Sequence, residues 1–167
     1  MTEGVAWEMT EARDILHKEI LPAFLNYVKR EDIVYEIGKG EFDYHAWRSN
    51  IITLDRDVSK HPDLVVDVEA TNNSVELRCD ALMCIGVLEE CDNPFHLIEG
   101  VRRMLKDGGV VVFGIALIGN EPYKNDFWRF TINGARKLIG KFEALEEKII
   151  YTKEVPSYAF IIARNVK

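Results

Sequence analysis

Val34-Tyr35-Glu36-Ile37-Gly38-Lys39-Gly40 is the stretch that decides the fold. Its apolar residues are typical of a β-strand, and the two glycines that follow allow a tight turn and a close approach to a ligand. Nineteen residues after Glu36, the run Ile51-Ile52-Thr53-Leu54 ends at Asp55. This matches the separation of about 20 residues expected for an acid that binds ribose. The pattern predicts a nucleotide-like cofactor; the alternatives are a plain turn at the glycines and a capping role for Asp55.

Length, composition and charge limit the classes of protein that fit. The chain has 167 residues, of which 47% are hydrophobic, and a formal charge of −7. A chain of this size can bury about 70% of its unfolded surface, which predicts one domain over 1–167, with a helical segment over 1–30 and a core over 31–167. The charge makes nucleic acid an unexpected partner. Because no apolar run approaches ~18 residues and no secretion-signal layout begins the chain, we expect a cytoplasmic protein without a membrane span.

The cysteines and histidines predict no metal site. Cys79, Cys84 and Cys91 are odd in number, and their spacing fits neither paired zinc ligation nor a disulfide framework. We therefore expect reduced thiols. The four histidines are scattered along the chain and form no ligand pattern.

Periodicity predicts strands alternating with helices. An amphipathic helix is expected over 10–29, with a kink or break at Pro22. Further expected helices and strands are a short helix within 42–48, helices over 94–105 and 131–139, and strands over 33–37, 50–54, 64–66, 81–85, 110–117, 144–151 and 158–163. This order predicts an α/β fold: one doubly wound, Rossmann-like sheet, mostly parallel, with a C-terminal antiparallel β-hairpin and helices on both faces.

Four stretches resemble the class I S-adenosylmethionine-dependent methyltransferases, and among them the small type 11 group, over about 33–163. They are Glu36 to Gly40, Asp55 at the end of the second strand, Asp67-Val68-Glu69-Ala70, and Cys79 to Ile85 with Val87 to Glu90, together with the later run Arg103 to Gly109. The resemblance implies S-adenosyl-L-methionine as the cofactor. The cofactor-binding residues that it implies are Glu36, Gly38, Lys39, Gly40, Asp55, Arg56, Asp67, Val68 and Ile85.

A fifth stretch, from Pro122 to Thr131, is similar to an Asn-Asp-Tyr-Trp-Arg-Phe-Thr signature found in a subset of these proteins. The resemblance implies that this loop borders the acceptor pocket. The implied substrate-binding residues are Tyr123, Asp126, Trp128 and Arg129. If the acceptor needs a general base, Asp126, Tyr123 and Glu90 are the candidates. Structural roles are the main alternative: Asp126 as a turn cap, Trp128 as packing, and Arg129 as a bridge to an acid or a carbonyl.

Local charge separates two kinds of cofactor. Near the glycine turn, Glu36, Glu41 and Asp43 outnumber Lys39. These acids would repel the pyrophosphate of a nicotinamide cofactor but suit the cationic sulfonium and ammonium of S-adenosylmethionine. An oxidoreductase therefore ranks below a methyltransferase.

The sequence predicts methyl transfer to a small-molecule or other modest-sized acceptor by in-line displacement. The alternative is a catalytically silent binding or scaffold protein, which is favoured by Phe42 in place of the usual third glycine, by the short first helix and by a brief amino-terminal region. Glu90 stands where a histidine is common, so an acid/base role of that histidine is not carried over. A homo-oligomer is left open.

Overall fold

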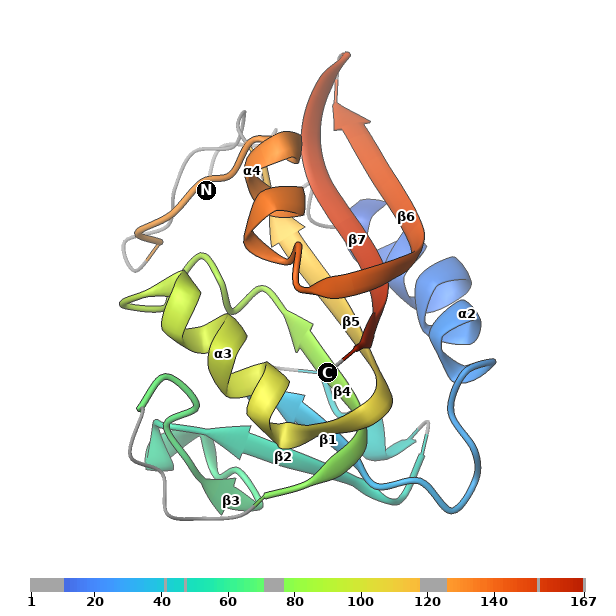
Figure 1. Ribbon diagram of the computed structural model, residues 1–167, viewed down its shortest axis with the longest axis vertical. Coiled ribbons are helices and arrows are strands. Elements are labelled where there is room, and N and C mark those ends of the chain that lie inside the picture. Colours follow the sequence, from blue (N-terminus) through green and yellow to red (C-terminus); the bar gives the residue numbers. More distant parts are fainter. Residues whose placement is uncertain are drawn as a thin grey trace.

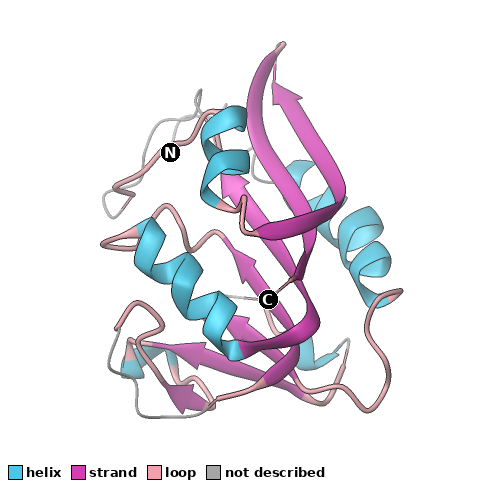
Figure 2. Cartoon of the chain, in the orientation of Figure 1, coloured by secondary structure: helices cyan, strands magenta, loops and turns pink. Residues whose placement is uncertain are grey.

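One sheet organises the computed structural model, which describes residues 11–40, 42–46, 48–70, 77–117, 126–152 and 154–166. Within these residues seven strands lie in the order β3-β2-β1-β4-β5-β7-β6 (Figures 1 and 2). The strands are β1 Val34–Ile37, β2 Ile51–Asp55, β3 Leu64–Val65, β4 Cys79–Ile85, β5 Leu105–Ala116, β6 Phe142–Thr152 and β7 Val155–Asn165. The order reverses direction between β1 and β4, which makes this crevice the topological switch point.

Strand pairing confirms the predicted sheet. β1 pairs in parallel with both β2 and β4, and β5 continues the parallel part beside β4. β7 runs antiparallel between β5 and β6, so the C-terminal hairpin places β6 at the sheet edge. β5 begins earlier than predicted, at Leu105, because the chain enters the strand directly from the preceding helix. Its register with β4 then shifts between the pairs Cys79–Leu105 and Ala81–Val110.

Two capped helices lie on one face of the sheet (Figure 1). α3 spans Pro94–Met104, and the Asn93 side chain caps it by accepting hydrogen bonds from the next N–H groups, at 3.0 Å from Phe95. α4 spans Ile132–Leu138 and begins after Thr131, whose hydroxyl accepts from Gly134 N at 2.9 Å. The predicted cap at Thr131 is therefore confirmed.

The N-terminal helix covers the opposite face. Residues 11–15 are helical, a wider π-turn follows at Leu16–Ile20, and α2 spans Leu21–Leu25. Pro22 is the second residue of α2 and cannot donate to a carbonyl four residues earlier, so the wider turn accommodates it. The helix therefore does not split at Pro22; it continues through this residue and changes from a π-turn to an α-helix at Leu21.

The crossover connections between β1, β2 and β3 contain very little helix. A single 3₁₀ turn, Tyr44–Ala46, joins β1 to β2, which agrees with the predicted limit of two helical turns. A second 3₁₀ turn, Val58–Lys60, follows β2, and Asp57 caps it by accepting from Ser59 N at 2.9 Å. The carboxyl ends of β1 and β2 are therefore covered by little helical structure.

The core has two halves, one on each face of the sheet. We call the first the α3–α4 face; it contains Tyr35, Ile37 and Leu82 together with residues of both helices. We call the second the N-terminal-helix face; it contains Val34 and Met83 packed under the N-terminal helix. Side chains alternate along a strand, and Glu36 pairs with Met83, so Glu36 lies on the N-terminal-helix face.

The three cysteines are buried free thiols, as predicted. Among the described residues, no helix combines the length and apolar character that crossing a membrane requires.

Candidate functional site

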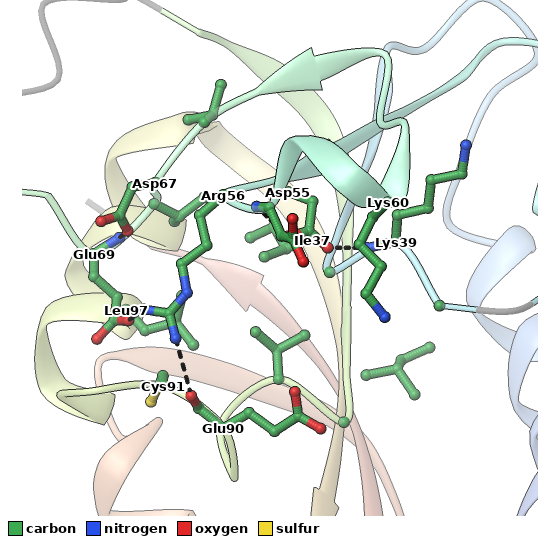
Figure 3. Close-up of a pocket in the computed structure, with 18 of the residues that line it drawn as sticks. Ile37, Lys39, Asp55, Arg56, Lys60, Asp67, Glu69, Glu90, Cys91 and Leu97 are labelled. Carbon is green, nitrogen blue, oxygen red and sulfur yellow. Dashed lines mark hydrogen bonds and ion pairs between the residues drawn. The ribbon is translucent and has the colours of Figure 1, made fainter. Parts of the chain in front are cut away.

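A cavity of about 430 Å³ lies at the carboxyl ends of the strands beside the switch point (Figure 3). Its lining residues are Ile37, Gly38, Lys39, Gly40, Asp55, Arg56, Asp57, Lys60, Val66, Asp67, Val68, Glu69, Ile85, Gly86, Val87, Glu90, Cys91, Leu97 and Phe127. Gly38 has φ of +79°, and a Cβ there would lie 2.8 Å from Val87 Cγ2. Only glycine lets the β1 turn pass this close to the β4 turn, which forms the floor of the crevice.

Asp55 joins the glycine turn to the end of β2. Its Oδ2 accepts from Lys39 N at 2.9 Å, and its Oδ1 accepts from Asp57 N at 2.8 Å. Each carboxylate oxygen can accept a second hydrogen bond. Asp55 can therefore hold the turn in place and still accept hydrogen bonds from hydroxyl groups of a ligand in the cavity.

The segment after β3 is fixed against α3. Glu69 accepts from Asn93 N at 2.6 Å and from Asp92 N at 3.2 Å, which anchors the segment to the start of the helix. On the other side, a Cβ at Gly100 would lie 2.1 Å from the carbonyl oxygen of Val68. The backbone of this segment thus packs directly on α3 and presents Val68 to the cavity.

Arg56 reaches across the cavity (Figure 3). Its guanidinium lies 2.9 Å from Asp92 and 3.3 Å from Glu69, and it donates to the carbonyl oxygen of Glu90 at 3.3 Å. Arg56 is therefore held by acceptors on both the β3 and the β4 sides. The guanidinium therefore forms part of the cavity wall, where a flat ligand group could pack against it.

The segment that begins at Asp126 docks on the turn that follows β4. Phe127 N and Trp128 N both donate to the carbonyl oxygen of Glu89, and Trp128 Nε1 donates to the Cys91 carbonyl at 2.9 Å. Arg129 pairs with Asp126 and donates to the Trp128 carbonyl at 2.9 Å. Arg129 thus bridges to an acid and a carbonyl, one of the structural roles left open by the sequence.

Two buried carboxyl groups titrate near neutral pH. Burial raises the pKa of Glu36 to about 8. Burial likewise raises the pKa of Glu89 to about 7, even though Oε1 accepts a hydrogen bond from Ala116 N. The Oε2 atoms of both residues have no hydrogen-bond partner among the described residues. Burial also raises the pKa of Glu90, which lies at the cavity, and the charge of Asp126 adds to the effect.

The structure brings most of the expected site residues together. Nine predicted residues line the cavity: Gly38, Lys39, Gly40, Asp55, Arg56, Asp67, Val68, Ile85 and Glu90. Glu36 is not among the lining residues, because its side chain is buried within the core of the N-terminal-helix face. Asp126, Trp128 and Arg129 are also outside the lining, although Phe127 between them belongs to it. Tyr123 falls outside the described residues.

Several lining residues were missed by sequence reasoning. Val66, Lys60, Leu97 and Phe127 carry no polar motif that marks them as ligand contacts. Val66 and Leu97 were apolar positions of the predicted strand over 64–66 and helix over 94–105, a signal that indicates core packing. Phe127 lies within the stretch from Pro122 to Thr131, which the resemblance placed beside the acceptor pocket without singling out this residue. Within the described part of the chain, no group of three or more His, Cys, Asp or Glu side chains is placed to hold a metal ion.

Comparison with known proteins identifies the fold. No family model matches the chain, and no curated protein matches it by sequence. Solved structures do match. The N-methyltransferase NodS from Bradyrhizobium japonicum WM9, in complex with S-adenosylhomocysteine, has a TM-score of 0.71 at 15% identity, with 93% of this chain and 88% of that one covered.

Two other similar structures illustrate the range of proteins with this fold. The 1,6-didemethyltoxoflavin-N1-methyltransferase from Burkholderia thailandensis, with 1,6-didemethyltoxoflavin and S-adenosylhomocysteine bound, has a TM-score of 0.66 at 15% identity, covering 95% of this chain and 84% of that one. The cyclase SpnF has a TM-score of 0.69 at 14% identity, covering 88% and 80%. The chain therefore has the fold of the class I S-adenosylmethionine-dependent methyltransferases.

Proposed function

We propose that this protein is an S-adenosylmethionine-dependent methyltransferase acting on a small-molecule or other modest-sized acceptor. The observation that carries the proposal is the cavity at the switch point, with the Asp55 carboxylate at the end of β2 and the Asp67–Val68 segment facing α3. Ligands of open α/β sheets bind at this crevice, and about 430 Å³ is within the range of small-molecule sites. Similar structures with S-adenosylhomocysteine bound support the same cofactor.

Different groups of cavity residues suit different parts of the methyl donor. Asp55 has acceptor capacity for the ribose hydroxyls, while Val66, Val68 and Leu97 supply apolar walls for adenine. Gly38 and Gly40 leave room for the methionine portion beside the β1 turn. Bound S-adenosylmethionine supplies an electrophilic methyl group, and the protein orients it and excludes water.

The charge of the lining supports a cationic ligand. Five carboxylates line the cavity, at Asp55, Asp57, Asp67, Glu69 and Glu90, against the three cations Lys39, Arg56 and Lys60. Arg56 is already paired with Glu69 and Asp92. The excess of acid favours a sulfonium and an ammonium over a pyrophosphate, in agreement with the sequence.

Isothermal titration with S-adenosylhomocysteine, with NADH as the comparison ligand, tests this proposal. We expect S-adenosylhomocysteine to bind with a micromolar dissociation constant and NADH not to bind at millimolar concentration. Tight binding of NADH, or no binding of S-adenosylhomocysteine at millimolar concentration, contradicts the proposal.

A second candidate function is a binding or scaffold protein that holds the donor without transferring its methyl group. The short crossings favour it, because single 3₁₀ turns at Tyr44–Ala46 and Val58–Lys60 leave little material to enclose an acceptor. Donor binding without product over a broad panel of acceptors, together with a stable protein partner, is the result that selects it.

A further inference from the structure

Tyr158 brings a hydroxyl group to the carboxyl end of β4 from the distant hairpin. Its side chain packs on the N-terminal-helix face, against the same core half as Ile85. A Cβ at Gly86 would lie 3.8 Å from the Tyr158 hydroxyl. Ile85 and Gly86 both line the cavity, whereas Tyr158 is not itself among the lining residues; its partly exposed side chain places the hydroxyl next to Gly86 at the edge of the cavity.

A glycine inside β5 makes room for this side chain. Gly114 pairs with Ile85 in the middle of the sheet, where a glycine weakens a strand. A Cβ at Gly114 would lie 3.1 Å from the Tyr158 hydroxyl and 2.8 Å from Ile85 Cγ2. A larger residue at 114 would therefore push the Tyr158 hydroxyl away from β4, and the glycine maintains its position.

The hydroxyl is suited to hydrogen bonding with a ligand. No hydrogen bond joins it to another side chain or backbone group of the described residues. Burial raises the pKa of Tyr158 well above its usual value, and the negative charge of Glu89 adds to the effect. The phenol therefore stays protonated and can both donate and accept a hydrogen bond.

The cavity has an adenosine end and a transfer end if the proposed function holds. Asp55, Asp67 and Leu97 occupy the adenosine end, which leaves the crevice between Gly38 and Gly86 for the sulfonium. The acceptor must lie beyond that point, with its nucleophilic atom about 3 Å from the methyl carbon. The Tyr158 hydroxyl is the polar group that the hairpin places next to Gly86.

We propose that Tyr158 is a catalytic residue at the methyl-transfer point, where its hydroxyl oxygen accepts a hydrogen bond from the N–H or O–H group of the acceptor. This proposal rests on the proposed function. The lone pair of the acceptor atom forms the new bond to the methyl carbon while the carbon–sulfur bond breaks, and its electron pair stays on sulfur to give S-adenosylhomocysteine. The acceptor then releases its proton to solvent, and Tyr158 stays protonated and orients the acceptor.

The test uses two ligands that differ at the transfer point. Sinefungin carries an amine where S-adenosylmethionine carries its methyl group, whereas S-adenosylhomocysteine carries nothing there. Tyr158→Phe removes one oxygen atom, and Tyr35→Phe is the matched control because Tyr35 is a buried tyrosine on the α3–α4 face. Isothermal titration of both ligands is performed on the wild-type protein and both variants, after thermal unfolding has shown that they are folded.

We expect Tyr158→Phe to weaken sinefungin binding about tenfold and to leave S-adenosylhomocysteine binding within twofold of wild type. Tyr35→Phe should change neither. Equal effects on the two ligands, or no effect on sinefungin, overturn the role of Tyr158 while leaving the proposed function intact. If wild-type protein binds neither ligand, the proposed function fails, and the role of Tyr158 fails with it.

Discussion

The two faces of the sheet differ in what they bury at the carboxyl ends of the strands. On the α3–α4 face the interior is mainly aliphatic, with Tyr35 and the three cysteines among its ionisable groups, and it continues into the cavity wall through Ile37 and Leu97. The N-terminal-helix face also holds ionisable side chains near the carboxyl ends of the strands, namely Glu36, Tyr44 and Tyr158. Burial raises the pKa of Tyr44 to about 12, so this phenol also stays protonated. In the proposed enzyme the α3–α4 face contributes Ile37 and Leu97 to the donor site, and the N-terminal-helix face contributes Tyr158 to the methyl-transfer point.

Gly100→Ala should have the largest effect, because it breaks the tight packing of the α3–α4 face. The new Cβ would lie 2.1 Å from the Val68 carbonyl oxygen, so α3 or the segment after β3 must move. We expect a loss of about 3 kcal/mol in the free energy of unfolding, measured with urea. His96→Ala, an exposed position on the same helix, should cost much less. Equal stability of Gly100→Ala and wild type would refute the close contact.

Glu36→Gln tests the ionisable character of the other face. Because burial raises the pKa of Glu36 to about 8, the folded state binds this proton more tightly than the unfolded state. The stability that the folded protein gains from binding this proton is fully present below pH ~4.5 and is lost as pH rises through about 8. We expect Glu36→Gln to be more stable than wild type at pH 8 by about 1 to 3 kcal/mol, with little difference at pH 4.5.

Urea unfolding at several pH values between 4.5 and 8.5 measures this difference. Glu31→Gln, at an exposed position, is the control and should follow the wild-type curve. If the stability of Glu36→Gln had the same pH dependence as wild type, the Glu36 carboxylate would be solvated. The proposed difference between the two faces would then be wrong for this residue.

Trp128→Phe should have the smallest effect on stability. It tests how much the contact between Trp128 and the turn after β4 contributes at the edge of the α3–α4 face. The change removes the hydrogen bond from Trp128 Nε1 to the Cys91 carbonyl but keeps an aromatic ring. Since the ring is 40% exposed, water can replace part of the bond, and we expect a loss of about 1 kcal/mol in thermal or urea unfolding. Trp128→Leu should lose more, because it removes ring packing as well. A stability above wild type in Trp128→Phe is the contrary outcome.

Local sequence was enough to predict the sheet and the half of the site that lies next to the strand ends. Gly38 and Asp55 follow apolar runs directly, so their position at the switch point comes from the strands themselves. Strand alternation also indicates that Glu36 lies on the opposite side of the sheet from Tyr35 and Ile37. The family motif nevertheless implied that Glu36 binds the cofactor, like the other acids at the strand ends. Contacts between distant segments carry no such local signal.

Arg56 illustrates what local patterns miss. Its partner Asp92 is 36 residues away, and the two meet only in the tertiary structure, where Glu69 anchors the segment after β3 to the start of α3. Tyr158 is further still from the β4 tip, and its position depends on β7 inserting between β5 and β6. These placements require the tertiary structure.

Binding of ribose by Asp55 is the central claim, and a thermodynamic cycle tests it most directly. The dissociation constants of S-adenosylhomocysteine and of its 2′,3′-dideoxy analogue are measured for wild type and for Asp55→Ala. The account predicts that wild type loses ten- to a hundredfold in affinity when the hydroxyls are removed, whereas Asp55→Ala binds both ligands equally weakly. Asp55 also holds Lys39 N, but that contribution cancels in the cycle. An equal loss of affinity for the dideoxy ligand in both proteins would contradict the account.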